Sequence, residues 1–300
     1  MIKGSIAAIV TPFLENGEID FDCYGRIIEF HIKHGSNGLV VLGTTGEAPT
    51  VNDDESAALV SYVVRTAHGR IPIIAGCGFN DTARAKKRCV AAERMGADAI
   101  LLLTPYYNKA NYKGMTEHFT TCADSVNIPI IIYNVPSRTG CSLTVEQIAE
   151  LKKHRNISGI KEASGNMSFL TKVCSLADDD FAVYCGCDDI NVPALSVGAV
   201  GMISVLANIL PKECREMTEH MEKGNIALAR AMQHRYGGLI SALFSEVNPI
   251  PIKTALNILS FKDIGNVGSF RLPMCEMGAE AREKLEKELL LVAEDLEKYR

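Results

Sequence analysis

Lys161 is the residue whose type and surroundings most strongly indicate chemistry. It lies in the apolar segment 157–164, and burial among apolar side chains disfavours the charged form of an amine. The neutral amine is the form that attacks a ketone carbonyl to give an imine. A structural ion pair is the alternative, but the adjacent Glu162 would point to the opposite face of a strand. We therefore predict that Lys161 is a nucleophile.

Tyr133 and Arg138 belong to a second polar segment, which begins within the apolar run 129–135. Adjacent strands lie about 4.8 Å apart, so a phenol on the strand next to Lys161 could exchange protons with its amine. Alternatively, Tyr133 packs in the core and its hydroxyl bonds a backbone carbonyl. Arg138 follows in a loop, where it either binds a substrate carboxylate through two N–H groups or is a solvated surface arginine.

The turn Gly43–Glu47 offers the hydroxyls of Thr44 and Thr45 together with backbone N–H groups. Such a turn can bind a carboxylate, although many turns between a strand and a helix are rich in Gly and Thr. Asp188 and Asp189 have no histidine near them in the sequence, so we expect no metal site there. None of the seven histidines pairs with a candidate nucleophile, which argues against a Ser/His/Asp hydrolase.

Eight short apolar segments alternate with amphipathic ones along the chain. Because Ile, Val and Leu occupy both alternating positions, each segment is typical of a strand buried on both faces of a parallel sheet. The strands are predicted over Ser5–Thr11, Gly38–Thr44, Pro72–Gly78, Ala99–Pro105, Pro129–Val135, Ile157–Ser164, Phe181–Asp188 and Gly201–Ala207. Eight strand–helix units predict an α/β fold of the (β/α)8 TIM barrel type. A doubly wound sheet usually has fewer strands, and no Gly-x-Gly-x-x-Gly follows the first one.

The barrel is expected to occupy residues 1–224, and a C-terminal helical region residues 225–300. Within the barrel, the helix predicted over Asp53–Thr66 has Asp53 or Asp54 as its expected N-cap. After the last strand, helices are predicted over Pro211–Lys223, Ile226–Leu243, Ile252–Leu259 and Ala279–Tyr299. The last of these carries an apolar stripe at Leu285, Leu289, Val292 and Leu296.

The composition argues against several classes of protein. Of the 300 residues, 47% are hydrophobic and 22% charged, as is typical of a folded globular chain. A net charge of −5 and the lack of a long Lys/Arg run argue against nucleic acid or an anionic membrane as a partner. No apolar stretch approaches the roughly 20 residues that span a bilayer. The ten cysteines are scattered, so we expect reduced thiols in a cytoplasmic protein.

Three motifs stand at the ends of predicted strands: Gly43–Glu47, Tyr133–Gly140 and Lys161–Gly165. Together they resemble the dihydrodipicolinate synthase family. The resemblance covers nearly the whole chain, from Thr11–Phe13 to Arg271–Pro273. The wider superfamily contains pyruvate-dependent lyases and aldolases, among them N-acetylneuraminate lyase and 2-keto-3-deoxygluconate aldolase.

The resemblance implies a reaction without a cofactor. Lys161 would form an imine with pyruvate, and the derived enamine would attack the aldehyde of (S)-aspartate 4-semialdehyde. The amine of that substrate would then displace Lys161 and give cyclic 4-hydroxy-tetrahydrodipicolinate. The alternatives are another pyruvate-dependent aldolase, acting on N-acetylneuraminate or a 2-keto-3-deoxy sugar acid, and, remotely, a barrel that has lost catalysis. Arg138 favours the synthase, because sialic-acid lyases usually lack it and the synthases use it to hold the carboxylate of aspartate semialdehyde.

The resemblance also implies roles for further residues. A proton relay would consist of three hydroxyl groups, those of Tyr133, Thr44 and Tyr107. Tyr107 would reach in from a neighbouring subunit, since the family is typically a homotetramer built as a dimer of dimers. The carboxylate of pyruvate would be held by Thr45 and by the backbone of Gly186 and Ile203.

Regulation is the point where this sequence departs from the family's pattern. Lysine-inhibited members bind lysine at the subunit interface, and Asn80 and Tyr106 match residues of that allosteric site. Arg84, however, replaces a Glu that commonly meets the ammonium of the ligand, and Ser56 replaces a His. Because a cation facing a cation lowers affinity, we predict weak or absent inhibition by lysine.

Overall fold

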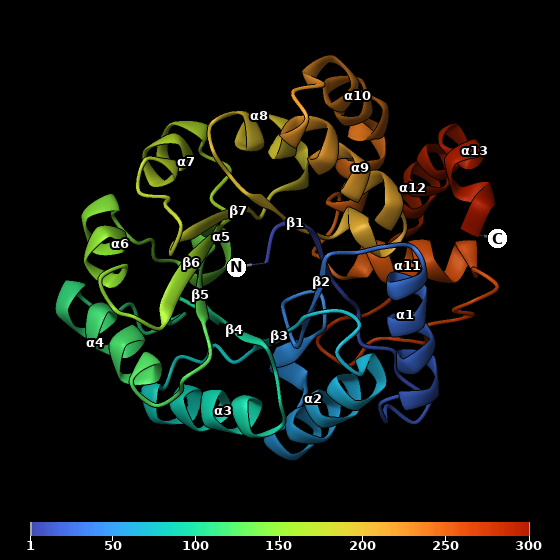
Figure 1. Ribbon diagram of the computed structural model, residues 1–300. Helices are drawn as coiled ribbons and strands as arrows, with labels where there is room; N and C mark the ends of the chain where they lie inside the picture. The colour runs from blue at the N-terminus through green and yellow to red at the C-terminus, as the bar shows by residue number, and fades with distance from the viewer. Residues whose placement is uncertain (1, 300) are drawn as a thin grey trace.

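The eight predicted strands form one closed parallel barrel. The computed structural model describes residues 2–299, and in it each strand pairs with its neighbours in sequence order while β8 closes onto β1 (Figure 1). The strands are β1 (Gly4–Ala8), β2 (Gly38–Val41), β3 (Ile73–Gly76), β4 (Ala99–Leu103), β5 (Ile130–Asn134), β6 (Ile157–Glu162), β7 (Ala182–Cys185) and β8 (Gly201–Ser204). The predicted (β/α)8 TIM barrel is confirmed.

Both faces of the strands are buried, as their composition predicts. Side chains of one face fill the barrel interior, for example Ile6, Val40, Ile74, Leu101 and Ile131. Those of the other face pack beneath the surrounding helices. The predicted strands end one to three residues too late, because the chain leaves the sheet there to form the loops at the barrel mouth.

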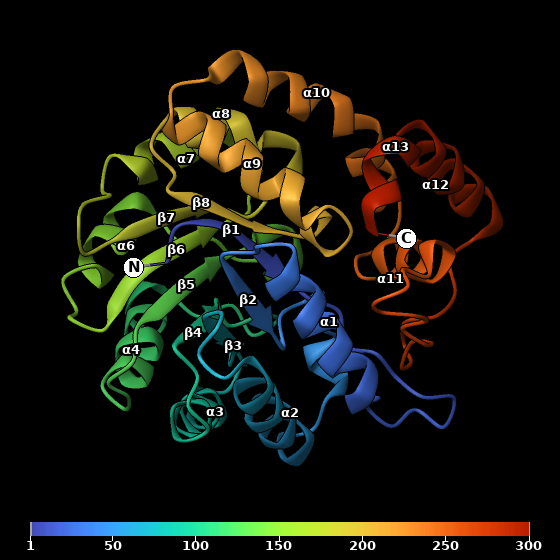
Figure 2. The same ribbon diagram turned by 45° about the vertical axis from the view of Figure 1, so that its right-hand side comes forward.

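The helices lie around the outside of the barrel (Figures 1 and 2). Up to β8 and its closing helix they are α1 (Phe21–Lys33), α2 (Asp53–Ala67), α3 (Thr82–Arg94), α4 (Tyr112–Ala123), α5 (Pro136–Thr139), α6 (Val145–Leu151), α7 (Met167–Cys174), α8 (Asn191–Ser196) and α9 (Pro211–Glu222). The expected N-cap of α2 at Asp53 or Asp54 is wrong. Asn52 caps this helix instead, in a reciprocal capping box with Glu55.

Four further helices follow the barrel: α10 (Ile226–Leu243), α11 (Ile250–Leu259), α12 (Ala279–Leu291) and α13 (Ala293–Leu296). The single helix predicted over 279–299 is wrong, because the backbone leaves helical geometry at Val292 (φ −111°, ψ 19°). The predicted apolar stripe is nevertheless buried. Figure 2 shows α11–α13 at one side of the barrel, where Tyr299 packs against Phe30 of α1 and donates a 2.6 Å hydrogen bond to Glu213 of α9.

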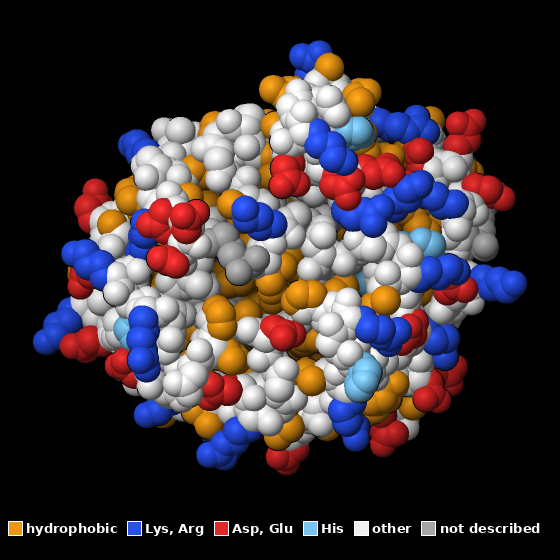
Figure 3. Space-filling view, viewed as in Figure 1, with side chains coloured by type: hydrophobic (Ala, Val, Ile, Leu, Met, Phe, Trp, Pro, Cys, Tyr) orange, Lys and Arg blue, Asp and Glu red, His pale blue; other side chains and the backbone are white. Residues whose placement is uncertain are grey.

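Charges of both signs alternate around the rim of the face seen in Figure 1, while hydrophobic side chains gather near its centre (Figure 3). Within residues 2–299, no helix is both long and apolar enough to cross a membrane. In the same range, no group of three or more His, Cys, Asp or Glu side chains is arranged to hold a metal ion. The ten cysteines are all free thiols.

Candidate active site

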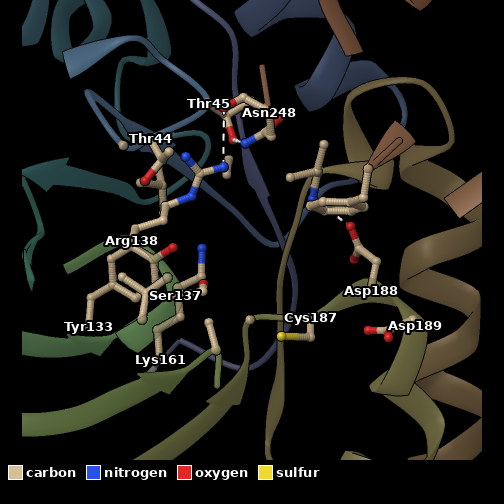
Figure 4. A pocket seen from close by; sticks show the side chains of 18 of the residues that line it. Thr44, Thr45, Tyr133, Ser137, Arg138, Lys161, Cys187, Asp188, Asp189 and Asn248 are labelled. Carbon is tan, nitrogen blue, oxygen red and sulfur yellow. Dashed lines mark hydrogen bonds between the residues drawn. The ribbon is translucent and has the colours of Figure 1, made fainter. Parts of the chain in front are cut away.

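A cavity of about 620 Å³ opens at the carboxyl ends of the strands, where TIM barrels carry their active sites. Its walls come from the ends of β2, β5, β6 and β7 and from α10. Among the residues that line it are most of the predicted site residues: Thr44, Thr45, Tyr133, Arg138, Lys161 and Gly186. Figure 4 shows the side chains of the first five around one space.

Lys161 and Tyr133 lie side by side at the base of this cavity. They are direct partners in the pairing of β6 with β5, and the Lys161 Nζ lies 4.5 Å from the centre of the Tyr133 ring. Each residue is only 6% exposed. No hydrogen-bond acceptor among residues 2–299 reaches the Lys161 amine, so the nitrogen is available to a molecule in the cavity.

Glu162 faces away from Lys161, as the alternation along a strand predicts. It is buried, and its carboxylate accepts a 2.7 Å hydrogen bond from the Ser164 N–H. Burial raises the pKa of Glu162, and the hydrogen bonds it accepts oppose that rise. The two adjacent residues therefore do not form an ion pair, so Glu162 does not give Lys161 a purely structural role.

Gly186 lies against Lys161 and leaves it room. A Cβ at this position would stand 2.9 Å from the Lys161 Cε and 2.7 Å from the Ala163 Cβ. The Gly186 N–H is already donated to the Glu162 carbonyl at 2.7 Å. This N–H is thus not free for a substrate carboxylate, and what Gly186 gives the cavity is the space that a side chain would fill.

The turn at Thr44 and Thr45 has two backbone N–H groups without an acceptor within residues 2–299. The N–H groups of Gly46 and Glu47 are used inside the turn, donating to the carbonyls of Gly43 and Thr44 at 3.1 Å. Two adjacent free amides beside two hydroxyls are an arrangement suited to an anion, and the binding of a carboxylate here stays a prediction.

Asn248 connects this turn to Arg138, and its role was not predicted. Its side-chain amide donates a 3.0 Å hydrogen bond to the Thr45 Oγ1, while its backbone carbonyl accepts one of 3.2 Å from Arg138 Nη2 (Figure 4). Arg138 is otherwise exposed at the cavity wall. The only signal in the sequence was the position of Asn248, a polar residue directly before the apolar segment of α11.

Two predicted site residues lie outside the cavity of their own chain. Tyr107 is 88% exposed, has a left-handed backbone (φ 74°) and donates its N–H to the Thr139 carbonyl at 3.3 Å. Ile203 is buried in β8, paired with Ile6 of β1, and is not among the lining residues of the described chain.

Asp188 organises the neighbouring rim, and Cys187 and Asp189 line the cavity beside it. The Asp188 carboxylate accepts hydrogen bonds of 2.9 Å from the N–H groups of Val205 and Leu206, so it fixes the loop after β8. Burial raises the pKa of the Cys187 thiol to about 12, which keeps it protonated and unreactive.

The residues predicted to bear on lysine inhibition cluster between α2, α3 and the loop after β4. Arg84 lies 3.2 Å from the Asp53 carboxylate, with its guanidinium 4.0 Å from the centre of the Phe79 ring. Tyr106 packs edge-on against the same ring at 6.0 Å. The Asn80 carbonyl accepts a hydrogen bond from Asn108, and the Ser56 hydroxyl donates to the Asn52 carbonyl.

The sequence model of the Dihydrodipicolinate synthetase family matches residues 1–291. The chain belongs to this family. A 4-hydroxy-tetrahydrodipicolinate synthase of Caldicellulosiruptor saccharolyticus is 45% identical, over 97% of this chain and 97% of that protein. The family resemblance predicted from the three motifs is confirmed.

Two solved structures of the family show the same fold. The dihydrodipicolinate synthase of Acinetobacter baumannii, complexed with pyruvate, superposes with a TM-score of 0.93 at 38% identity and covers 98% of this chain and 99% of its own. The enzyme of Cyanidioschyzon merolae, with lysine bound, has a TM-score of 0.93 at 34% identity and covers 97% and 98%. Both structures therefore correspond to nearly the whole of this chain.

Proposed function

We propose that this protein is a lyase that condenses pyruvate with (S)-aspartate 4-semialdehyde, the 4-hydroxy-tetrahydrodipicolinate synthase reaction of lysine and diaminopimelate biosynthesis. The observation that carries the proposal is the pair of Lys161 and Tyr133, an amine without an acceptor beside a phenol at the base of a cavity. Membership of the family and the names of its relatives support the same reaction.

The chemistry follows from the amine. Lys161 Nζ attacks the C2 carbonyl of pyruvate, and loss of water leaves an imine. Removal of a proton from C3 gives the enamine, whose C3 attacks the aldehyde carbon of the second substrate. The amine of that substrate then adds to C2, and Lys161 leaves as the ring closes. These steps use only amine and carbonyl groups, so the proposal includes no cofactor and no metal.

Tyr133 is positioned to move the protons that these steps require. Its ring contacts the amine, and addition to and loss from an imine each need proton transfer at the reacting oxygen and nitrogen. Thr44 continues the relay toward the cavity mouth. We assign Tyr107 of a neighbouring subunit to its outer end, which its near-complete exposure in a single chain supports, and we propose a homotetramer accordingly.

The two carboxylates are assigned to two different walls. Free amides and hydroxyls at Thr44 and Thr45 suit the carboxylate of pyruvate. Arg138, which follows β5 and donates to the Asn248 backbone carbonyl, suits the carboxylate of the semialdehyde. Because its N–H is occupied, Gly186 contributes space rather than a donor.

Borohydride reduction in the presence of pyruvate tests the imine. Intact-mass analysis should show one pyruvate-derived adduct per chain, and peptide mapping should place it on Lys161. Steady-state rates with aspartate semialdehyde, compared with N-acetylmannosamine plus pyruvate, test the second substrate. An adduct on another lysine, or faster turnover of the sugar, would contradict the proposal.

A further inference from the structure

Glu47 and Lys253 form a buried ion pair that takes no direct part in the proposed reaction. Lys253 is fully buried, and its Nζ lies 2.8 Å from the Glu47 Oε1. The same ammonium donates to the carbonyls of Thr11 at 3.0 Å and Ser269 at 2.5 Å. The second Glu47 carboxylate oxygen accepts a 3.2 Å hydrogen bond from the backbone N–H of Arg271. Both charged groups are therefore fully coordinated away from water.

This pair joins the C-terminal helices to the turn that carries Thr44 and Thr45. Lys253 belongs to α11, whereas Glu47 ends the turn after β2. The Glu47 backbone is left-handed (φ 54°, ψ 35°), a conformation that costs a non-glycine residue free energy and needs support from its surroundings. Its N–H donates to the Thr44 carbonyl at 3.1 Å. The residue that Lys253 holds is thus the one that closes the turn onto Thr44.

The same C-terminal segment holds the turn at a second point. Five residues before Lys253, Asn248 donates to the Thr45 hydroxyl at 3.0 Å. The turn is therefore attached to residues 248–253 through Thr45 at one end and through Glu47 at the other. The free amides belong to Thr45, which is one of these attachments, and to Thr44, the residue directly before it.

We propose that the Glu47–Lys253 pair positions this turn to bind the carboxylate of pyruvate. Donors that are fixed before the anion arrives bind it more tightly, because they need no reorganisation. A buried ion pair is often no more stabilising than an apolar pair of the same size, so its place beside the turn needs an explanation other than stability. Lys253 is a positioning residue in this view, and the inference rests on the proposed role of Thr44 and Thr45.

The Lys253→Met substitution tests the proposal, because it keeps an unbranched side chain of similar size and removes the charge. The readout is the pyruvate concentration that gives half-maximal borohydride trapping, measured together with KM for each substrate. We expect the variant to need a pyruvate concentration about 10-fold or more above that of the wild-type protein for half-saturation. This is the effect of weakening a hydrogen bond to a charged group. Trapping at saturating pyruvate should persist, since Lys161 is intact, and KM for the semialdehyde should change by less than about 2-fold.

A matched control is Glu213→Gln, which alters another buried carboxylate that binds the C-terminal region, through Tyr299, without lining the cavity. It should lower stability and leave half-saturation by pyruvate unchanged. If Lys253→Met does not fold, half-saturation by pyruvate is measured on the double variant E47Q/K253M, which lacks both buried charges.

Unchanged half-saturation in the folded variant, or an equal change in Glu213→Gln, would overturn the positioning role. A parallel rise in KM for the semialdehyde would also overturn it, because it would indicate general damage to the cavity. Absence of any adduct in the wild-type protein would instead overturn the proposed function, and the positioning role with it.

Discussion

Lys161 and Lys253 are both almost completely withdrawn from water, and each amine lies near an aromatic ring, but they differ in the oxygen acceptors around them. Lys161 lies at the base of the cavity against a Tyr133 ring and has no acceptor for its amine within residues 2–299. Lys253 lies behind the Thr44–Glu47 turn, with one carboxylate and two carbonyl oxygens within 3.0 Å of its Nζ. The first opens to a cavity, and the second is sealed.

The difference shows that burial alone does not make a lysine a nucleophile. Burial lowers the pKa of Lys253, but Glu47 opposes the decrease, and three oxygen acceptors match the three N–H donors of an ammonium. Such a group stays charged and has no lone pair to offer. Lys161 lacks these acceptors and faces a space of about 620 Å³, so its nitrogen can meet a carbonyl carbon.

Replacing Lys161 is the change that should have the largest effect. Lys161→Arg keeps a long basic side chain at the cavity base but removes the nucleophile, because a guanidinium is not nucleophilic at neutral pH. We expect turnover to fall by about 10⁴-fold or more and the borohydride adduct to disappear. Circular dichroism checks that the fold persists. An adduct that remains in this variant would show that another lysine is the nucleophile, and the contrast between Lys161 and Lys253 would not hold.

Removing the Tyr133 hydroxyl tests whether the neighbour of the reactive amine acts chemically. Tyr133→Phe keeps the ring that contacts Lys161 and deletes the proton carrier, so we expect kcat to fall by about 10²- to 10⁴-fold. The imine should still form at long incubation, because the amine is unchanged. Wild-type kcat in this variant would show that Tyr133 only packs against the amine.

Lys253 should matter more for stability than for chemistry. Lys253→Met leaves Glu47 charged and unpaired in the interior, which we expect to lower the free energy of unfolding by about 3–5 kcal/mol. The double variant E47Q/K253M should recover most of this loss, because no buried charge remains. Urea-induced unfolding measures both values, and Lys33→Met, at an exposed ion pair with Asp263, should change the free energy by less than about 1 kcal/mol.

The sequence identified Lys161 but not Lys253, and the reason is physical. A lysine in a strand that is buried on both faces is conspicuous in the sequence, because it cannot reach solvent except at the strand end. Its neighbour on β5 follows from strand order. Lys253 lies in a helix, where a lysine normally reaches solvent by its flexible stem. Its burial depends on α11 packing behind the turn at Glu47, a tertiary contact between residues 206 positions apart that no local pattern encodes.

Loop geometry was the other part that the sequence could not supply. The eight strands and the motif positions followed from periodicity, yet the free amides of Thr44 and Thr45 depend on which N–H groups the turn uses internally. In the same way, the sequence does not show that the Gly186 N–H is used by the Glu162 carbonyl, because this too depends on the backbone path of the loop. The break at Val292 lies within an uninterrupted helical pattern, so propensity alone predicted one helix where packing produces two.

A third amine extends the comparison, the ammonium group of free lysine. Like the Lys253 ammonium, it needs oxygen acceptors around it to be bound as a cation. In lysine-inhibited family members a Glu commonly supplies such an acceptor, and this chain has Arg84 at that position. Arg84, stacked on Phe79, shares the Asp53 carboxylate with Arg88. Two guanidinium groups on one carboxylate leave an excess positive charge, which disfavours an incoming ammonium. We therefore expect inhibition by lysine to be weak or absent in steady-state assays.

The substitution Arg84→Glu sharpens this prediction. It places a carboxylate at the position and leaves Asp53 paired with Arg88 at 2.9 Å. We expect the affinity for lysine to increase by about 10-fold, or about 1.4 kcal/mol, measured by calorimetry as well as by inhibition. Wild-type kcat should persist, because Arg84 does not line the active-site cavity. Inhibition of the unmodified protein by micromolar lysine would show that this chain holds the ligand's ammonium by other acceptors, and that Arg84 does not decide regulation.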